Sequence, residues 1–222
     1  MIRRSAAEQG GARPRGRDYP IHESEAVDRL KRGDIGGLET LVRLYQSQAL
    51  DAAVLITRDY AAAEDVVQEA FLRALRHIQA FDGTRPFGPW FLRIVVHGAL
   101  TTASKAAAQR ELSLEARSTP GWTPKRARPS ISRCRAWSLE PGLQEMLEAA
   151  ETREEILSAL EGLSPGQRAA MVMRYYLDWS DAEASERLGD APGTVRWRLN
   201  RARERLRQLL PPWVTHPQKG ES

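Results

Sequence analysis

The 222-residue chain has a single cysteine, Cys134, and only four histidines, at positions 22, 77, 97 and 216. One thiol cannot form an internal disulfide, and it cannot supply a cysteine cluster for structural zinc. The histidines are far apart in the sequence, and there is no glycine-rich phosphate loop and no paired nucleophile and base. We therefore expect no metal, no cofactor and no catalytic residue, which argues against an enzyme.

Long hydrophobic runs are also missing, and none approaches the roughly 20 apolar residues that a membrane helix needs. The first 20 residues, MIRRSAAEQGGARPRGRDYP, contain five arginines but no apolar centre, so they do not read as a secretory signal. We interpret residues 1–22 as a disordered basic tail and residues 212–222 as a second tail. The sequence predicts a cytoplasmic protein that is not inserted in a membrane.

The apolar residues that are present recur at helical spacing in two separate stretches. In residues 23–104 they fall three or four positions apart, as in Leu38, Leu41, Val42 and Tyr45. Residues 105–150 lose this period and include STPGWTPKRARPS, a composition that cannot bury a core. Helical patterns return in residues 151–211. The expected fold is all-α, with two small helical domains joined by a long flexible linker.

The second domain carries the start and stop signals of a helix-turn-helix. Ser164 and Ser180 each precede a residue, Gln167 or Glu183, that can complete a capping box three positions later. Gly189 can end a short helix in the left-handed conformation, and Pro192 can begin the next helix. Two helices joined by such a tight turn are typical of a DNA-binding unit.

The last helix of this unit has two different faces. Val195, Leu199, Ala202 and Leu206 form a narrow apolar stripe at about 100° per residue. Residues 193–207 also contain six arginines and one glutamate, so the opposite face is strongly basic. Arginine and asparagine can read base edges in the major groove, and tryptophan can press on a thymine methyl group or a sugar. The candidate DNA-binding residues are Gly193, Thr194, Arg196, Trp197, Asn200, Arg201 and Arg203. Two alternatives stay open: a merely solvated arginine-rich helix, and a Trp197 that packs sideways on a neighbouring helix.

Three segments resemble the extracytoplasmic-function (ECF) type of bacterial RNA polymerase sigma factor. AAEDVVQEAFLRAL, Ala62 to Leu75, and the following PFGPWFLRIVVHGAL are similar to sigma region 2. The stretch from Leu163 to Arg207 is similar to sigma region 4. The resemblance covers more than half of the chain, in the family's order and with a linker between the regions. It implies a bacterial, non-enzymatic protein that binds core RNA polymerase and directs promoter recognition and transcription initiation.

The resemblance also implies roles for individual residues. The clamp coiled coil of the polymerase largest subunit is expected to bind Asp65, Gln68, Glu69, Phe71 and Leu72. The −10 element, captured as single-stranded DNA, is expected to contact Arg85, Trp90, Arg93, His97 and Lys105. The last helix is expected to enter the major groove of the −35 element, and an anti-sigma factor is an expected further partner.

Several residues depart from the family pattern or have a simpler interpretation. His97 stands where the family usually has Asn, and Trp197 stands where a small residue such as Ser is usual. Phe81, Phe87, Trp90 and Phe91 are expected to build the core more than to stack on bases. Acidity near a helix start would explain Asp65 or Glu69 alone. The alternative function is a stand-alone helix-turn-helix regulator, which would bind operator DNA without polymerase.

Overall fold

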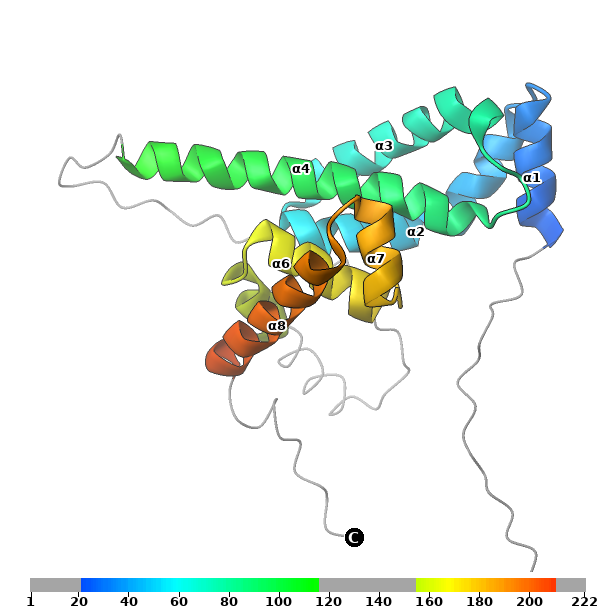
Figure 1. Ribbon diagram of the computed structural model, residues 1–222. Helices are drawn as coiled ribbons and strands as arrows, with labels where there is room; N and C mark the ends of the chain where they lie inside the picture. The colour runs from blue at the N-terminus through cyan, green and yellow to red at the C-terminus, as the bar shows by residue number, and fades with distance from the viewer. Residues whose placement is uncertain (1–20, 116–154, 211–222) are drawn as a thin grey trace, which may run out of the picture.

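A computed structural model describes residues 21–115, here called the front half, and residues 155–210, the rear half. Every regular element in these two stretches is a helix (Figure 1). The elements are α1 (Ile21–Lys31), α2 (Gly36–Thr57), α3 (Tyr60–His77), the short 3-10 helix η1 (Ile78–Ala80), α4 (Phe87–Glu115), α6 (Pro165–Met171), the π-helical turn η2 (Val172–Tyr176), α7 (Asp181–Leu188) and α8 (Pro192–Leu209). Residues 155–161 are also helical. The all-α prediction is confirmed.

The front half is a helical bundle around an aromatic core. Phe91 is fully buried, stacks on Phe71 with ring centroids 4.3 Å apart, and lies 5.6 Å from the ring of Phe87. Phe81 is buried beside Phe87, and Trp90 is partly buried against the same cluster. The expectation that these aromatic residues build the core is confirmed, because their rings fill the space between α2, α3 and α4.

The rear half contains the helix-turn-helix. Ser164 and Ser180 cap α6 and α7, and both capping boxes are complete, with Gln167 and Glu183 as the reciprocal partners. Gly189 ends α7 at a left-handed φ of 71°, and Pro192 begins α8. Ala191, at the N-cap of α8, makes no side-chain capping bond. The local signals in the sequence therefore set the helix boundaries of this half.

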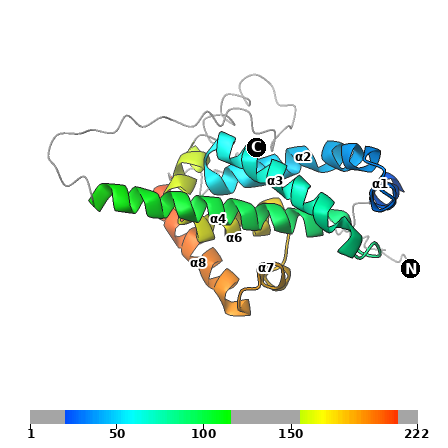
Figure 2. The same cartoon turned by 90° about the horizontal axis from the view of Figure 1, so that it is seen from above.

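The two halves pack directly on each other beneath α4 (Figure 2). One continuous cluster of buried apolar side chains includes residues of α2 and α4 together with Met173, Leu177 and Trp179 of the rear half. The sequence predicted two domains on a tether and gave no sign of this contact. The shared cluster shows that, in this arrangement, each half completes the burial of apolar surface on the other.

Polar side chains also cross from one half to the other. The guanidinium of Arg168, which is 7% exposed, donates to the carbonyl oxygens of Ile56 and Leu163, both at 2.7 Å. Burial, followed by repulsion from Arg58, lowers the pKa of Arg168 to about 10. Arg168 therefore remains charged at neutral pH, and its two bonds offset part of the cost of burying that charge. Tyr176 donates to the carboxylate of Asp51 at 3.1 Å, which is a second polar link between the halves.

Helix α4 is longer than the sequence suggested. It continues to Glu115, whereas the first domain was expected to end at residue 104. The added stretch lacks an apolar stripe, but it is rich in alanine and long unbranched residues that favour helix. Residues 21 and 22, predicted as the end of the first tail, instead begin α1. The rest of the predicted tails and most of the predicted linker, with Trp122, Cys134 and Trp137, lie outside the described residues.

Candidate nucleic-acid and protein interfaces

Helix α8 presents to solvent the face that the sequence assigned to DNA. Its apolar stripe is inside: Val195, Leu199 and Ala202 are 1%, 2% and 0% exposed. Trp197 is 60% exposed, so the alternative in which it packs on a neighbouring helix is not what the structure shows. Arg196, Asn200, Arg201 and Gly193 are exposed as well, while Thr194 and Arg203 are intermediate. The basic face is therefore open along most of its length.

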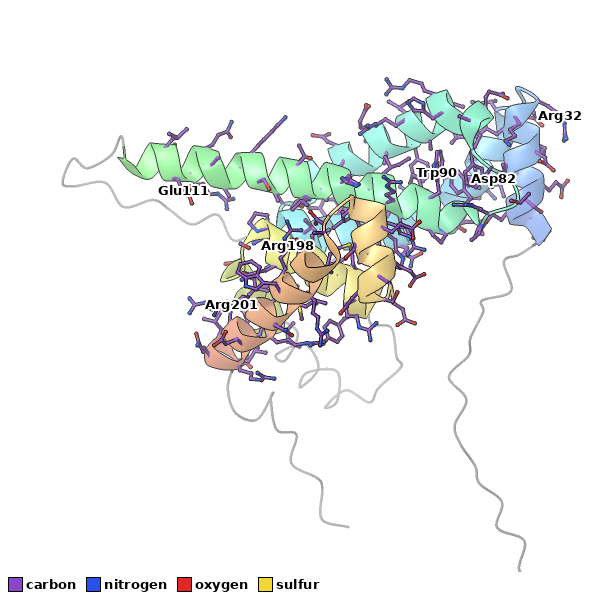
Figure 3. The ribbon with its side chains drawn as sticks, viewed as in Figure 1. Arg32, Asp82, Trp90, Glu111, Arg198 and Arg201 are labelled. Carbon is purple, nitrogen blue, oxygen red and sulfur yellow. The ribbon has the colours of Figure 1, made fainter. Side chains whose placement is uncertain are left out.

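Two arginines of α8 are held by neighbouring side chains. Arg198 is paired with Asp190, in the turn before α8, so Asp190 does not serve as a side-chain cap for that helix. Arg203 donates through Nε to the hydroxyl of Tyr175 at 2.9 Å and lies over the tyrosine ring. Arg201 faces Glu204 at 3.1 Å in an exposed pair (Figure 3). Exposed pairs of this kind are weak, so Arg201 can exchange Glu204 for a phosphate or a base at little cost.

The segment assigned to the −10 element surrounds a cavity of about 630 Å³. Arg85 and Trp90 line it from the turn before α4 and from α4 itself, and Arg93 lines it one turn further on. Arg85 and Arg93 are exposed, and Trp90 is intermediate. Cations beside an accessible aromatic ring are what a captured nucleotide base and its phosphate require. Lys105 is exposed on α4 but does not line this cavity.

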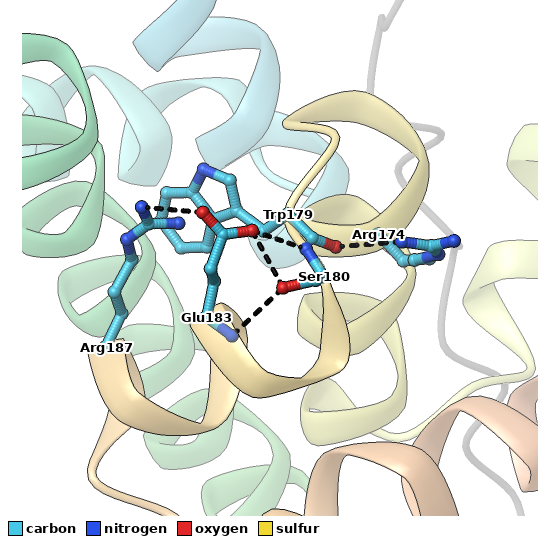
Figure 4. Close-up of polar contacts among 5 residues, drawn as sticks. All are labelled: Arg174, Trp179, Ser180, Glu183 and Arg187. Atoms are coloured by element: carbon cyan, nitrogen blue, oxygen red, sulfur yellow. Dashed lines mark hydrogen bonds and ion pairs between the residues drawn. The ribbon is translucent and has the colours of Figure 1, made fainter.

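Helix α7 of the rear half closes the other side of this cavity. Its lining residues there are Glu183, Glu186 and Arg187. Arg187 stacks over the ring of Trp179, 4.4 Å from the centroid, and pairs with Glu183 at 3.3 Å (Figure 4). His97 is half-buried, and its Nε2 donates to the carbonyl oxygen of Arg187 at 3.1 Å. In this arrangement His97 holds the two halves together and is turned toward α7.

Figure 4 also shows how α7 begins. The carboxylate of Glu183 accepts from the backbone N–H of Ser180 at 2.9 Å and from its hydroxyl at 2.8 Å. These two bonds, and then the charge of Arg187, lower the pKa of Glu183. Arg174 donates to the carbonyl oxygen of Trp179 at 3.4 Å. The start of the helix-turn-helix is thus fixed by one carboxylate and one hydroxyl.

An apolar groove runs between α2 and α3 on the front half. Leu38, Val42 and Gln46 of α2 and Val67, Gln68, Phe71 and Leu72 of α3 line a volume of about 340 Å³. Leu72 is 51% exposed, and Asp65, Gln68 and Glu69 are exposed beside it. Phe71 is only 8% exposed, so it forms the floor of the groove rather than its rim.

The acidic residues of this groove lie further along α3 than acidity at a helix start would require. Helix α3 begins at Tyr60, with Asp59 as its capping residue, and its first turn contains no acidic side chain. Asp65 therefore lies beyond the turn in which a helix dipole acts strongly. Helix-start acidity therefore does not account for Asp65 or Glu69, and Glu69 forms an exposed ion pair with Arg76 at 2.7 Å.

The structure adds residues that the sequence did not single out. Glu23 and Lys31 of α1 hold the turn before α4, Tyr175 contacts Arg203, and Arg168 joins the halves. A lone Glu or Lys in a polar helix has no local signature, because its partner is 50 or more residues away. Among the described residues there is no cluster of three metal-ligating side chains, and none of the helices in residues 21–115 and 155–210 could span a bilayer.

Comparison with known proteins places both halves in one family. Residues 41–109 match "Sigma-70 region 2" and residues 153–206 match "Sigma-70, region 4". The ECF RNA polymerase sigma factor SigL of Mycobacterium tuberculosis is 34% identical over 159 residues, which is 71% of this chain and 80% of SigL. SigW of Bacillus subtilis is 28% identical over 184 residues, covering 83% of this chain and 94% of SigW.

A solved structure supports the same fold. CnrH, in complex with the cytosolic domain of CnrY, superimposes with a TM-score of 0.53 at 23% identity, over 85% of this chain and 96% of CnrH. Matches to both sigma regions, in order, together with a relative above 30% identity over most of its length, settle the family. The exposed arginines of α8 agree with this result. The chain belongs to the ECF sigma factors, non-enzymatic proteins that bind RNA polymerase and direct it to promoters.

Proposed function

We propose that this sigma factor reads the −35 element with α8, captures the −10 element at the turn before α4, and binds the polymerase clamp coiled coil in the α2–α3 groove. The observation that carries the proposal is the division of α8 into a buried apolar stripe and an open face with Trp197 and Arg201. A recognition helix needs both, because one side must be held rigidly while the other enters the groove.

For the −35 element, Gly193, Arg196, Trp197, Asn200 and Arg201 supply the exposed surface. Arg196 and Arg201 can each form a bidentate bond to guanine, and Asn200 can do the same with adenine. Trp197 offers an apolar surface to a thymine methyl group, which a serine at that position would not provide. Thr194 and Arg203, at the edges, suit phosphate contacts that set the register.

For core polymerase, the α2–α3 groove offers an apolar floor beside an acidic rim. Leu72 is the large exposed apolar side chain of this groove, and Asp65 and Glu69 are exposed on the same helix, Glu69 in an exposed ion pair with Arg76. A partner helix with apolar and basic residues would fit this combination, since apolar burial supplies affinity and opposite charge supplies orientation. The clamp coiled coil is the partner that the family resemblance implies for these positions.

An anti-sigma factor and a location in the bacterial cytoplasm, where polymerase acts, are part of the same proposal. Both rest on the family resemblance. The solved relative CnrH has a second protein bound, the cytosolic domain of CnrY. For this chain, co-purification from its own host would test whether such a partner exists.

The test is transcription in vitro with purified core polymerase, the full chain and genomic DNA fragments, followed by sequencing of transcript 5′ ends. We expect initiation at defined sites that share −35 and −10 motifs. Arg196→Ala or Arg201→Ala should relax selectivity at single −35 positions by about tenfold or more. Arg110→Ala, an exposed arginine on α4, is the matched control and should leave selectivity unchanged.

Core binding is measured separately, by titrating labelled chain with core enzyme in the absence of DNA. Leu72→Ala and Asp65→Ala should weaken binding, while Leu112→Ala, at another exposed leucine at the far end of α4, should not. Retained core affinity in Leu72→Ala and Asp65→Ala, together with retained −35 selectivity in the arginine variants, would refute the site assignments. Tight, selective promoter binding without polymerase would instead favour the stand-alone regulator.

A further inference from the structure

The turn that carries Arg85 is fastened to α1 from both of its ends. At its beginning, the ammonium of Lys31 donates to the carbonyl oxygen of Phe81 at 2.7 Å. The amide of Gln79 donates back to the carbonyl oxygen of Lys31 at 2.8 Å. Lys31 also lies over the ring of Phe81, 5.9 Å from its centroid. The last turn of α1 and the chain just before Asp82 are thus joined by two reciprocal bonds.

At the other end, Glu23 fixes the first residue of α4. Its side chain is buried, with the residue 5% exposed, and its carboxylate accepts from the backbone N–H of Phe87 at 2.7 Å. The same carboxylate accepts from the hydroxyl of Tyr45 on α2. A carboxylate at the N-terminus of a helix is stabilised by the unpaired N–H groups there. Glu23 therefore connects α1, α2 and the start of α4.

Between these two anchors the turn is folded on itself around Asp82. The carboxylate of Asp82 accepts from the backbone N–H of Thr84 at 3.0 Å and from its hydroxyl at 2.7 Å. These bonds lower the pKa of Asp82. Arg85 lies 3.5 Å from the same carboxylate. The turn is therefore a closed unit, so a movement of its ends would move Asp82 and the Arg85 paired with it relative to Trp90.

This unit supplies the front-half wall of the −10 cavity, and α7 supplies the opposite wall. Phe81, Asp82, Arg85 and Trp90 all line it, and Lys31 and Glu23 hold the chain immediately before and after that stretch. Neither anchor lines the cavity itself. A base captured from duplex DNA must first unstack, so the free energy of capture has to exceed the cost of unstacking, and a displaced pocket wall reduces that margin.

We propose that α1 is the positioning element of the −10 cavity, with Lys31 and Glu23 as positioning residues for strand opening. This rests on the proposed function, since it assumes that Arg85 and Trp90 contact the −10 strand. Lys31 and Glu23 therefore affect the opening of the −10 duplex. A −10 element that is already single-stranded has no unstacking cost to offset, so the same weakening of capture lowers its occupancy less.

The experiment compares two templates with full chain and core polymerase: a duplex promoter, and the same promoter with unpaired bases at the −10 element. Lys31→Met removes the donor and keeps most of the stem. We expect it to lower initiation on the duplex by about tenfold, and on the unpaired template by less than about twofold. Arg32→Met is the matched control, an exposed neighbouring cation that should change neither (Figure 3).

Glu23→Gln is the second variant, because it keeps an oxygen acceptor for Phe87 while it removes the charge and replaces the oxygen that accepts from Tyr45 by an amide NH2 group. It should show the same preference for the unpaired template, to a smaller extent. Equal losses on both templates, or the same loss in Arg32→Met, would overturn the inference, and so would a Lys31→Met chain that opens the duplex normally. A wild-type chain that starts no transcript on either template would instead refute the proposed function.

Discussion

The same change, glycine to alanine, is expected to have opposite effects at two positions. Gly37, at the start of α2, is buried against α1, where a Cβ would overlap the carbonyl oxygen of Ala26 and lie 2.9 Å from the backbone nitrogen of Leu30. Gly193, at the start of α8, is exposed, and a Cβ there would meet no atom within 4 Å. Neither glycine has a left-handed φ, so backbone strain does not enter the comparison.

The magnitudes follow from what each methyl group would displace. At Gly37 both obstacles are backbone atoms of α1, which cannot rotate away, so α1 must shift and the overpacking should cost about 2 kcal/mol. At Gly193 alanine only restricts the unfolded chain and should stabilise the fold by up to about 1 kcal/mol. For a chain of this size, these values correspond to a melting temperature about 4 to 8 °C lower for Gly37→Ala, and up to about 4 °C higher for Gly193→Ala.

The assay is thermal unfolding of the full chain, followed by circular dichroism at 222 nm and repeated as a urea titration. A Gly37→Ala chain as stable as the wild type would refute the close approach of α1 and α2. Gly193→Ala adds a second test, because its methyl group faces the proposed DNA groove. It should therefore bind the −35 duplex more weakly although it is the more stable protein.

Three further outcomes are expected. The pKa of Glu183 is lowered, so its bonds to Ser180 stabilise the fold at a pH above the ordinary carboxyl pKa and are lost as the pH falls through the lowered pKa. In urea titrations at a series of pH values, the free energy of unfolding should fall less steeply in acid for Glu183→Gln than for the wild type. Leu199→Ala, at a side chain 2% exposed, should cost about 2 to 5 kcal/mol in the same titrations. Deoxyuridine lacks the methyl group of thymine, so its use in the −35 duplex should lower the DNA affinity of the wild type and leave the DNA affinity of Trp197→Ser unchanged. A fluorescence titration with polymerase present measures both affinities.

The sequence predicted best those features that short-range chemistry decides. Ser164, Ser180 and Gly189 signal helix ends within three or four residues, and each is found in the predicted role. The stripe of Val195 and Leu199 has a helical period, so its burial and the exposure of Trp197 follow from the same geometry. These predictions needed no knowledge of distant partners.

The sequence could not show features that depend on contacts between distant segments. Glu23 meets Phe87, 64 positions later, and Arg168 meets Ile56, 112 positions earlier. His97 was considered only for its place in the family pattern, and its bond to the carbonyl oxygen of Arg187 depends on how the rear half docks. No hydrophobic period or helix-capping pattern in the sequence predicts these contacts, because they arise from the packing of complete helices.

The apolar core shared by the two halves limits which promoter elements one molecule can contact at the same time in this conformation. Promoter elements at −35 and −10 are about 25 base pairs apart, which is about 85 Å along B-form DNA. Helices α4 and α7 are in contact, so the proposed −35 surface on α8 and the proposed −10 surface at Arg85 can reach both elements together only if the halves move apart. Separation of the halves exposes the buried side chains of Met173, Leu177 and Trp179 to solvent. A ligand that binds both separated halves must compensate for that exposure. A ligand that binds the halves while they are packed together prevents promoter binding without that cost.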